Sequence, residues 1–304
     1  MYLFRIPANT ISTIIPEVCQ AIYNVLKDEY LKIPDTEDEW KQVSRHFAEK
    51  WNFPNCLGAI DGKHINIKAP PNSGSLYFNY KQAHSIILMG LADANYKFLY
   101  INIGAPGRDS DGGVYMNCSL SQALENNTLN IPESTPLPGR KQPIPYVVVA
   151  DDAFALKPYM LKPFAFKSQS VPERIFNYRL SRARRIIENV FGIASARFRV
   201  LRRTMELSPP KVKIIVSAVC VLHNFLMSRK RSSAVYAPLG TFDTDNEDGT
   251  ITLGTWRNTE AVVLEPLQRT TVPRNATMAA KMIRDEFKEY FCREGEVPWQ
   301  RYYI

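Results

Sequence analysis

The stretch from residue 54 to about residue 150 has the sequence pattern of β-strands, and it constrains the fold more than any other feature of the chain. Leu57–Lys68 alternates apolar and polar residues towards its end, and Phe98–Gly104 returns from a turn that follows Ser85–Ala92. These three segments predict an antiparallel meander. Tyr146–Ala150 is a short β-branched run bounded by a proline and an aspartate pair, which indicates a buried central strand.

Helical periodicity flanks the strand-rich stretch on both sides. Apolar residues recur every three or four positions through residues 1–50, 174–196, 211–229 and 275–293. A further helix is expected near residues 113–126. The order of three strands, a helix, a fourth strand and more helices predicts an α/β fold in which helices flank a mixed sheet. A ribonuclease H-like sheet has this order, although the pattern alone does not select that topology.

The pattern divides the chain into three parts. Residues 1–53 form an N-terminal helical segment, in which Pro16 is expected to kink or split the first helix. Residues 54–230 form the α/β core, and residues 231–304 form a C-terminal tail with an acidic loop and a helix. The loop, residues 241–250, is rich in acids and turn formers, so we expect it to be mobile.

Composition excludes several classes of protein. No apolar run approaches the roughly 20 residues that span a bilayer, so no membrane partner is expected. The first ten residues lack the basic and apolar regions of a signal peptide. The five cysteines are scattered without a CxxC pair, which is typical of buried thiols in a reducing compartment, and no two of the four histidines have zinc-ligand spacing. These features predict an intracellular protein.

Basic charge is concentrated in one stretch of the chain. Between Arg174 and Arg203 the sequence has nine arginines, no lysine and a single acid, Glu188. This stretch carries a net charge of +8, as much as the whole chain. A dense set of guanidinium groups suits binding to a phosphate backbone. The alternative is a solvated helix face that is balanced by acids of a neighbouring element, and charge alone does not decide between the two.

Most acidic residues lie in the first turns of helices or in polar loops, but three do not. Asp61 lies within an apolar strand context, where an ionised carboxylate costs free energy unless it is paired or bound to a metal. Asp151 follows the strand at Tyr146–Ala150, a usual place for functional groups in α/β sheets. Glu188 directly follows Ile187 of the apolar stripe, so it lies at the edge of the buried face of the arginine-rich helix. Each has an ordinary alternative: a hairpin turn for the first, a helix N-cap for the second, and a surface pair with Arg184 for the third.

The grouping of three acids beside an arginine-rich stretch has a chemical reason. Hydrolysis of a phosphodiester needs an activated water and a stabilised leaving oxyanion, on a substrate that is itself an anion. Two Mg²⁺ ions about 4 Å apart meet both needs, and Mg²⁺ prefers oxygen ligands. Three acids from two strands and a helix are sufficient to hold such ions, while arginines bind phosphates away from the reacting one. The pattern therefore predicts a metal-dependent nuclease.

Several motifs together resemble those of PIF/Harbinger transposases and Harbinger transposase-derived nucleases. WNFPNCLGAIDGKHI (51–65) is similar to the first catalytic block of that family. VVVADDAF (147–154) and FNYRLSRARRIIENVFG (176–192) are similar to the strand and the helix that carry its second and third acids. Further family-like segments are YFNYKQAHS (77–85), GRDSDGGVY (107–115), LHNF (222–225) and VPWQ (297–300). The resemblance covers nearly the whole chain.

The resemblance implies a ribonuclease H-like fold and a DDE triad on Asp61, Asp151 and Glu188, with Mg²⁺ as the metal and Mn²⁺ as its substitute. It thereby implies a DNA endonuclease of transposase origin that works by a two-metal mechanism. Asp151 rather than Asp152 matches the family's second acid, and Ala150 stands where the family usually has glycine. The opening of the chain resembles the recognition helix of a helix-turn-helix, a partial remnant without the helices before it.

Double-stranded DNA is the expected partner. The arginines expected to contact it are Arg182, Arg184, Arg185, Arg202 and Arg203. Transposases of the family often work with a separate Myb-like DNA-binding protein, so the resemblance implies a partner of that kind. Nuclear localisation is implied by the resemblance and the substrate, with the cytoplasm as an additional compartment, and homo-oligomerisation is left open.

Two other functions compete with the nuclease. A descendant that has lost cleavage would be a DNA- or protein-binding adaptor on the same fold, with salt-sensitive duplex binding and no nicking; the presence of all three acids disfavours it. A phosphatase with an aspartate nucleophile needs an Asp-x-Asp pair at the end of a buried strand. The pairs Asp109/Asp111 and Asp243/Asp245 both lie in polar segments instead. The nuclease is therefore the leading hypothesis.

Overall fold

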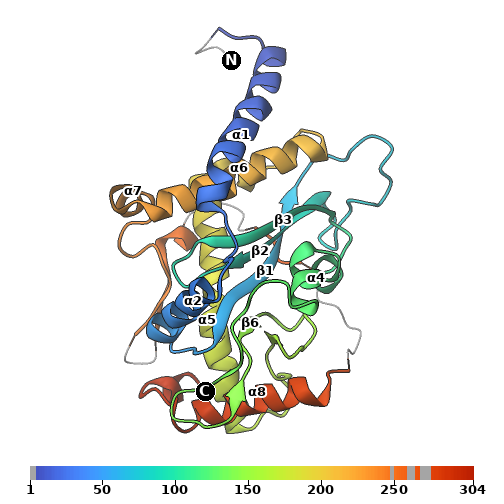
Figure 1. Cartoon of the computed structure of the whole chain (residues 1–304). Helices are drawn as coiled ribbons and strands as arrows, with labels where there is room; N and C mark the ends of the chain where they lie inside the picture. The colour runs from blue at the N-terminus through green and yellow to red at the C-terminus, as the bar shows by residue number, and fades with distance from the viewer. Residues whose placement is uncertain (1–4, 247–249, 259–263, 268–274) are drawn as a thin grey trace.

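A mixed five-stranded sheet with helices on both faces forms the centre of the molecule (Figure 1). The structure, a computed structural model, describes residues 5–246, 250–258, 264–267 and 275–304. The strand order across the sheet is β3-β2-β1-β6-β7. This architecture confirms the predicted α/β class with a mixed sheet, and it is consistent with a ribonuclease H-like fold.

The sheet combines an antiparallel meander with a parallel edge, as the strand pattern predicts. The meander consists of β1 (Cys56–Asn66), β2 (Ser85–Ala92) and β3 (Phe98–Pro106). The parallel part consists of β6 (Val147–Val149), which pairs with β1, and β7 (Met160–Leu161), which pairs with β6. Strand β7 has two residues, which is too short for any periodicity, so the sequence analysis did not find it.

The apolar run of β2 is explained by burial on both of its faces. Ile86 and Leu88 belong to one hydrophobic core, and Ile87 and Met89 belong to another. Successive side chains of a strand point to opposite faces, so these two cores lie on the two sides of the sheet. All eight residues of β2 are buried, as expected for a strand that is covered by helices on both sides.

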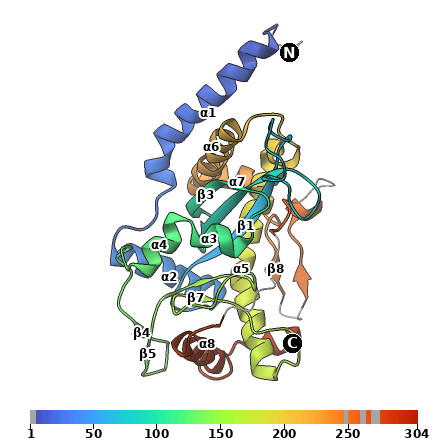
Figure 2. The same ribbon diagram turned by 90° about the vertical axis from the view of Figure 1, so that its right-hand side faces the viewer.

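Different helices cover the two faces of the sheet (Figure 2). One core includes apolar residues of α5 (Val171–Arg197) and α6 (Pro209–Ser228). The other includes residues of α3 (Asp111–Met116) and α4 (Ser119–Glu125). The helix expected near residues 113–126 is therefore two short helices.

Helix α5 carries the candidate acid Glu188, and its start is fixed by local sequence. The backbone N–H and the hydroxyl of Ser170 both donate to the Glu173 carboxylate, at 2.8 Å and 2.9 Å. This reciprocal capping satisfies donors that a helix N-terminus otherwise leaves unpaired. The helix is 27 residues long and packs against β1, β2 and β6, so it holds Glu188 rigidly over the sheet.

The N-terminal segment contains the two helices that the sequence predicts, α1 (Ala8–Tyr30) and α2 (Glu37–Trp51). Pro16 lies inside α1 without splitting it, so the alternative of two separate helices was wrong. Helix α1 packs against α6, and its N-terminal half projects from the body of the molecule (Figure 1). The Asn224 side chain donates to the carbonyl of Tyr30 at 2.6 Å and ties the end of α1 to α6.

The C-terminal tail shares the main core rather than packing apart from it. Helix α8 (Met278–Phe291) contacts α5, and the rings of Phe287 and Phe291 lie 5.5 Å and 5.0 Å from the ring of Phe53. The division of the chain after residue 230 stays a prediction. Other short elements are α7 (Lys230–Tyr236), the two-residue strands β4 (Thr135–Pro136) and β5 (Pro143–Ile144), and 3-10 helices such as η1 (Arg199–Arg202).

The acidic segment at residues 241–250 forms structure that the sequence analysis did not expect. Strand β8 (Thr244–Asp245) pairs with β9 (Ile251–Thr252) in a short hairpin. Asp245 is largely buried, because arginines of α5 neutralise it. The expectation of a mobile loop was therefore wrong for residues 241–246, and residues 247–249 lie outside the part that the structure describes.

Helix α6 is long and apolar enough to cross a bilayer by length and composition. The sequence-based statement that no apolar run approaches this length was therefore wrong. Half of the most apolar 18-residue stretch of α6 is buried within the fold, and α6 packs against α1 and β3. Val212 and Val216 belong to the main core, so burial against the sheet accounts for the apolar character of the helix.

Candidate active site

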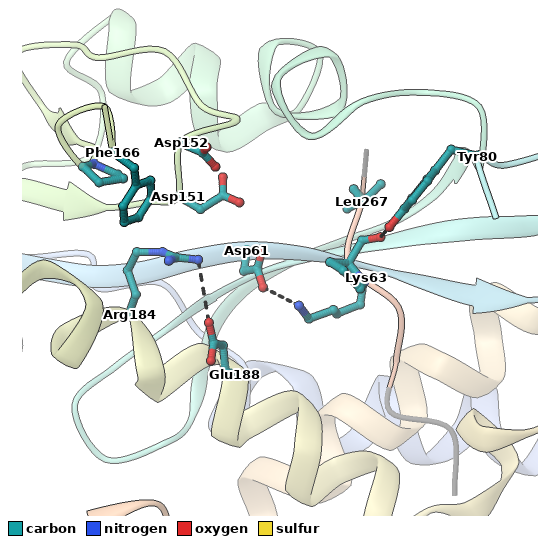
Figure 3. Close-up of a pocket in the computed structure, with 11 residues that line it drawn as sticks. Asp61, Lys63, Tyr80, Asp151, Asp152, Phe166, Arg184, Glu188 and Leu267 are labelled. Atoms are coloured by element: carbon teal, nitrogen blue, oxygen red, sulfur yellow. Dashed lines mark hydrogen bonds and ion pairs between the residues drawn. The ribbon is translucent and has the colours of Figure 1, made fainter. Parts of the chain in front are cut away.

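The side chains of Asp61, Asp151 and Glu188 line one cavity of about 490 Å³ (Figure 3). They come from three parts of the chain, since Asp61 lies in β1, Asp151 lies two residues after the end of β6, and Glu188 lies on α5. The structure thus brings together three acids that are distant in the sequence. Their catalytic role stays a prediction.

Strand pairing explains why the two aspartates meet. Strands β1 and β6 are parallel neighbours, with Ala59 opposite Val149. Two residues further along each strand come Asp61 and Asp151, so the register places them side by side at the end of β6. Asp61 is 4% exposed, and its partner in β2 is Gly90, which has no side chain to crowd it.

The carboxyl group of Asp151 is in an environment that disfavours its charge. Burial raises the pKa of Asp151, and the nearby carboxylate of Asp61 raises it further. The Arg184 guanidinium and the N–H of Ala153, which donates to Asp151 Oδ1 at 2.9 Å, act in the opposite direction without cancelling these effects. Asp152, which also lines the cavity, adds a small increase. Additional positive charge in the cavity would therefore stabilise the ionised form of Asp151.

Lys63 is a residue of the cavity that the sequence analysis did not identify. Its ammonium group lies 2.7 Å from Asp61 Oδ2, and both side chains are largely buried. Residues two apart in a strand point to the same face, so the spacing of Asp61 and Lys63 could have predicted this ion pair. In this conformation the lysine supplies a counter-charge to Asp61 (Figure 3).

Glu188 has the arginine neighbour that its position on a helix predicts. Arg184 Nη2 lies 3.9 Å from Glu188 Oε1, one helical turn away. The ordinary alternative of an Arg184–Glu188 pair is therefore present in the structure. The distance is longer than a hydrogen bond, and the Glu188 side chain is 39% exposed, so the pair is weak and can open.

The side chains of the cavity are of the chemical type that binds a divalent cation, but in this conformation they are not close enough together to share one. Carboxylate oxygens are the ligands that Mg²⁺ prefers, and the two adjacent aspartates concentrate negative charge. Within the described ranges, however, no three His, Cys, Asp or Glu side chains are grouped closely enough to hold an ion together. Asp61 and Asp151 are the residues that would hold a cation, and Glu188 would join them after it leaves Arg184.

The arginines that were expected to contact DNA have different environments. Arg182 Nε and Arg185 Nη1 lie 2.5 Å and 2.6 Å from the two carboxylate oxygens of Asp245. The alternative to DNA contact was a helix face whose charge is balanced by acids of a neighbouring element. Arg182 and Arg185 follow this alternative, because Asp245 balances their charge, although their side chains are buried rather than solvated. Contact of either one with phosphate would require Asp245 to move.

The other three expected DNA contacts are distributed along α5 and the turn after it. Arg184 lines the carboxylate cavity. Arg202 donates from Nε to the carbonyl of Ser195 at 2.7 Å, and Arg203 is exposed. DNA contact by these residues stays a prediction, with Arg184 and Arg203 the better placed of the five.

Comparison with known proteins defines the class. A family model described as DDE superfamily endonuclease matches residues 60–224, more than half of the chain. The chain belongs to this family, and all three candidate acids lie within the matched residues.

Individual relatives agree with the family match. The chain is 28% identical over 214 residues to "Protein ALP1-like" of Arabidopsis thaliana, covering 69% of this chain and 52% of the relative. It is 27% identical over 206 residues to "Putative nuclease HARBI1" of Xenopus laevis, covering 66% and 54%. The chain thus spans about half the length of the curated relatives it matches. No solved structure matches it. The named relatives confirm the resemblance to Harbinger transposase-derived nucleases.

Proposed function

We propose that this protein is a metal-dependent DNA endonuclease of transposase origin, which hydrolyses phosphodiester bonds by a two-metal mechanism. One observation carries the proposal: Asp61, Asp151 and Glu188, from two strands and a helix, line a single cavity. The membership of a nuclease family supports it, and that family uses divalent metals. Mg²⁺ is the proposed ion, with Mn²⁺ as its substitute.

Each side chain of the cavity has a role in this proposal. Asp61 and Asp151 hold divalent cations, which when bound activate the attacking water and stabilise the leaving oxyanion. Glu188 completes the set of oxygen ligands from the opposite side of the cavity. Arg184 presents its guanidinium group to a phosphate that enters the cavity. Lys63, which neutralises Asp61 in this structure, would have to leave it for that carboxylate to hold a cation.

The proposed substrate is double-stranded DNA. The net charge of +8 favours binding to a polyanion, and Arg203 is exposed for contact with the backbone. A separate Myb-like DNA-binding protein as partner, and the nucleus as compartment, follow from the same proposal.

A catalytically silent adaptor is the second candidate, and one feature of the structure favours it. Two of the three acids are paired within the chain, Asp61 with Lys63 and Glu188 with Arg184. If these pairs persist when divalent cations are present, Asp151 alone of the three acids is left to hold a cation, and the protein binds DNA without cutting it.

A plasmid assay separates the two candidates. Incubated with supercoiled plasmid, the full chain is expected to produce nicked circles in Mg²⁺ or Mn²⁺ and none in EDTA. The Asp61→Asn protein, purified in parallel, controls for contaminating nucleases and is expected to be inactive. Salt-sensitive binding of the plasmid without nicking in either metal would instead establish the adaptor.

A further inference from the structure

A second cavity of about 380 Å³ adjoins the carboxylate cavity. The two share Pro163, Phe166 and Arg184 as a common wall. The second cavity extends along α5 to Tyr178, and Ile251 of β9 and the C-terminal Ile304 line its other side. Its size is within the range of small-molecule sites. Its lining combines apolar and aromatic side chains with polar ones, among them Arg174, Arg184 and Arg185.

Two polar atoms of this cavity are buried without a hydrogen-bond partner among the residues that the structure describes. They are the hydroxyl of Tyr178 and Nε of Arg184. The Tyr178 ring is fixed by stacking on Tyr303, with centroids 4.5 Å apart and planes 13° apart, so its hydroxyl cannot easily turn towards another partner. Buried polar groups in native proteins are nearly always hydrogen-bonded. Both atoms are closed to water, however, so a ligand in the cavity reaches them only if the cavity wall moves.

The wall shared by the two cavities includes an exposed aromatic ring, Phe166, on a turn that side-chain hydrogen bonds hold in place. Phe166 is 72% exposed. The backbone before it is clamped by Asn177, whose amide accepts from Phe164 N at 2.8 Å and donates to Phe164 O at 2.9 Å. Gln169 donates to the carbonyls of Phe164 and Ala165 at 3.1 Å and 2.8 Å. These contacts hold the backbone of the turn that presents the exposed ring.

Phe166 lies close to the candidate catalytic residues. Figure 3 shows Phe166 beside Asp151 and Arg184 at one end of the carboxylate cavity, with Tyr80 at the other end. A nucleotide whose phosphate lies against Arg184 in the first cavity has its base within reach of the second. Aromatic side chains bind unpaired bases by stacking, and they do so whatever the base sequence.

We propose that the second cavity is a nucleobase subsite, which takes a base unstacked from the DNA strand beside the phosphate held in the carboxylate cavity. The Phe166 ring stacks on the base, and polar side chains of the lining, such as Arg174 and Ser181, provide hydrogen bonds to its edge. This inference rests on the proposed function, and it adds a preference for DNA with an unpaired base next to the cleavage position.

A short single-stranded oligonucleotide with a central 2-aminopurine tests the subsite in EDTA, where no cleavage occurs. Binding of the full chain is expected to quench the fluorescence of the base through stacking. The Phe166→Ala protein is expected to bind at least about fivefold more weakly, the lower end of the effect of one base–aromatic stack, and to lose the quenching. Phe166→Trp is expected to retain both. Tyr178→Phe, which keeps the stacked ring and removes only a hydroxyl that is closed to the cavity, is expected to change neither.

Two controls separate this inference from the proposed function. Leu239→Ala removes a fully exposed apolar side chain outside both cavities and should change neither affinity nor quenching. Asp151→Asn should keep the quenching. Equal quenching by wild type and Phe166→Ala overturns the subsite and leaves the nuclease intact. Quenching that depends on Phe166, in a protein that nicks no plasmid in either metal, overturns the nuclease and leaves base binding. Free 2-aminopurine nucleotide that competes as well as the oligonucleotide would also contradict a subsite for a DNA strand.

Discussion

Substitution of asparagine for Asp151 is expected to lower metal-dependent nicking at least about a thousandfold, which corresponds to about 4 kcal/mol of lost transition-state stabilisation. Asp151 lies beside Asp61 by strand register, so its amide analogue would remove the charge that holds a cation between them. The measurement is the initial rate of plasmid nicking in Mg²⁺ and in Mn²⁺.

The fold should tolerate this substitution. Burial and Asp61 raise the pKa of Asp151, so the folded protein prefers the neutral carboxyl more than the unfolded chain does. The stability that this preference contributes is present at low pH and is lost as pH rises through the raised pKa. At neutral pH the neutral asparagine is therefore expected to unfold at a temperature equal to or above that of the wild type.

Asp152→Asn is the matched control for Asp151→Asn. Asp152 lines the same cavity and directly follows Asp151, so its substitution removes the same charge at nearly the same place. Nicking is expected to remain within about tenfold of the wild type, since loss of one nearby charge is worth about 1 kcal/mol. If Asp152→Asn abolishes nicking and Asp151→Asn does not, the assignment of the second acid is wrong.

Substitution of leucine for Arg179 is expected to lower the free energy of unfolding by about 3–5 kcal/mol. Arg179 is 1% exposed, and Nη1 donates at 2.8 Å to both the carbonyl of Gly295 and the side chain of Gln300. Nη2 donates to the carbonyl of Asn52, and the guanidinium group lies 4.4 Å from the ring centre of Phe291. Its removal leaves the buried side chain of Gln300 and two partly buried carbonyls without this donor, at about 1–3 kcal/mol each before relaxation.

The measurement is equilibrium unfolding in urea. Arg174, which is exposed on the same helix, provides the control, and Arg174→Leu is expected to change stability by less than about 0.5 kcal/mol. Equal stabilities of the two variants would contradict the role given to Arg179. The contacts of Arg179 join α5 to the end of α2 and to the C-terminal turn, so the loss should also increase proteolysis of the tail.

Much of the fold could be predicted because the elements that build it are long and periodic. The eight-residue run of β2 and the apolar stripe of α5 carry their own signal in the sequence. Strand β7 and the hairpin of β8 and β9 have two residues per strand, and pairing with distant segments rather than local pattern creates them. Their prediction would have required the tertiary contacts themselves.

The candidate site, like the fold, could be predicted from the sequence only in part. Asp61 could be selected from the sequence because a carboxylate in an apolar context is unusual. Asp151 could be selected because it follows a predicted buried strand, and Glu188 because it is the single acid of the arginine-rich stretch. Phe166 could not, because a lone exposed phenylalanine is ordinary in sequence and gains meaning from the cavity beside it. The pairing of Arg182 and Arg185 with Asp245 joins residues about 60 positions apart, and no local pattern indicates it.

The most direct measurement of the central claim is the anomalous scattering of Mn²⁺ in crystals of the full chain. A peak is expected in the cavity within roughly 2.0–2.6 Å of carboxylate oxygens of Asp61 and Asp151, with Lys63 displaced from Asp61 and Glu188 turned from Arg184 towards the ion. A cavity without a peak at saturating Mn²⁺, in which Lys63 still lies against Asp61, would contradict it.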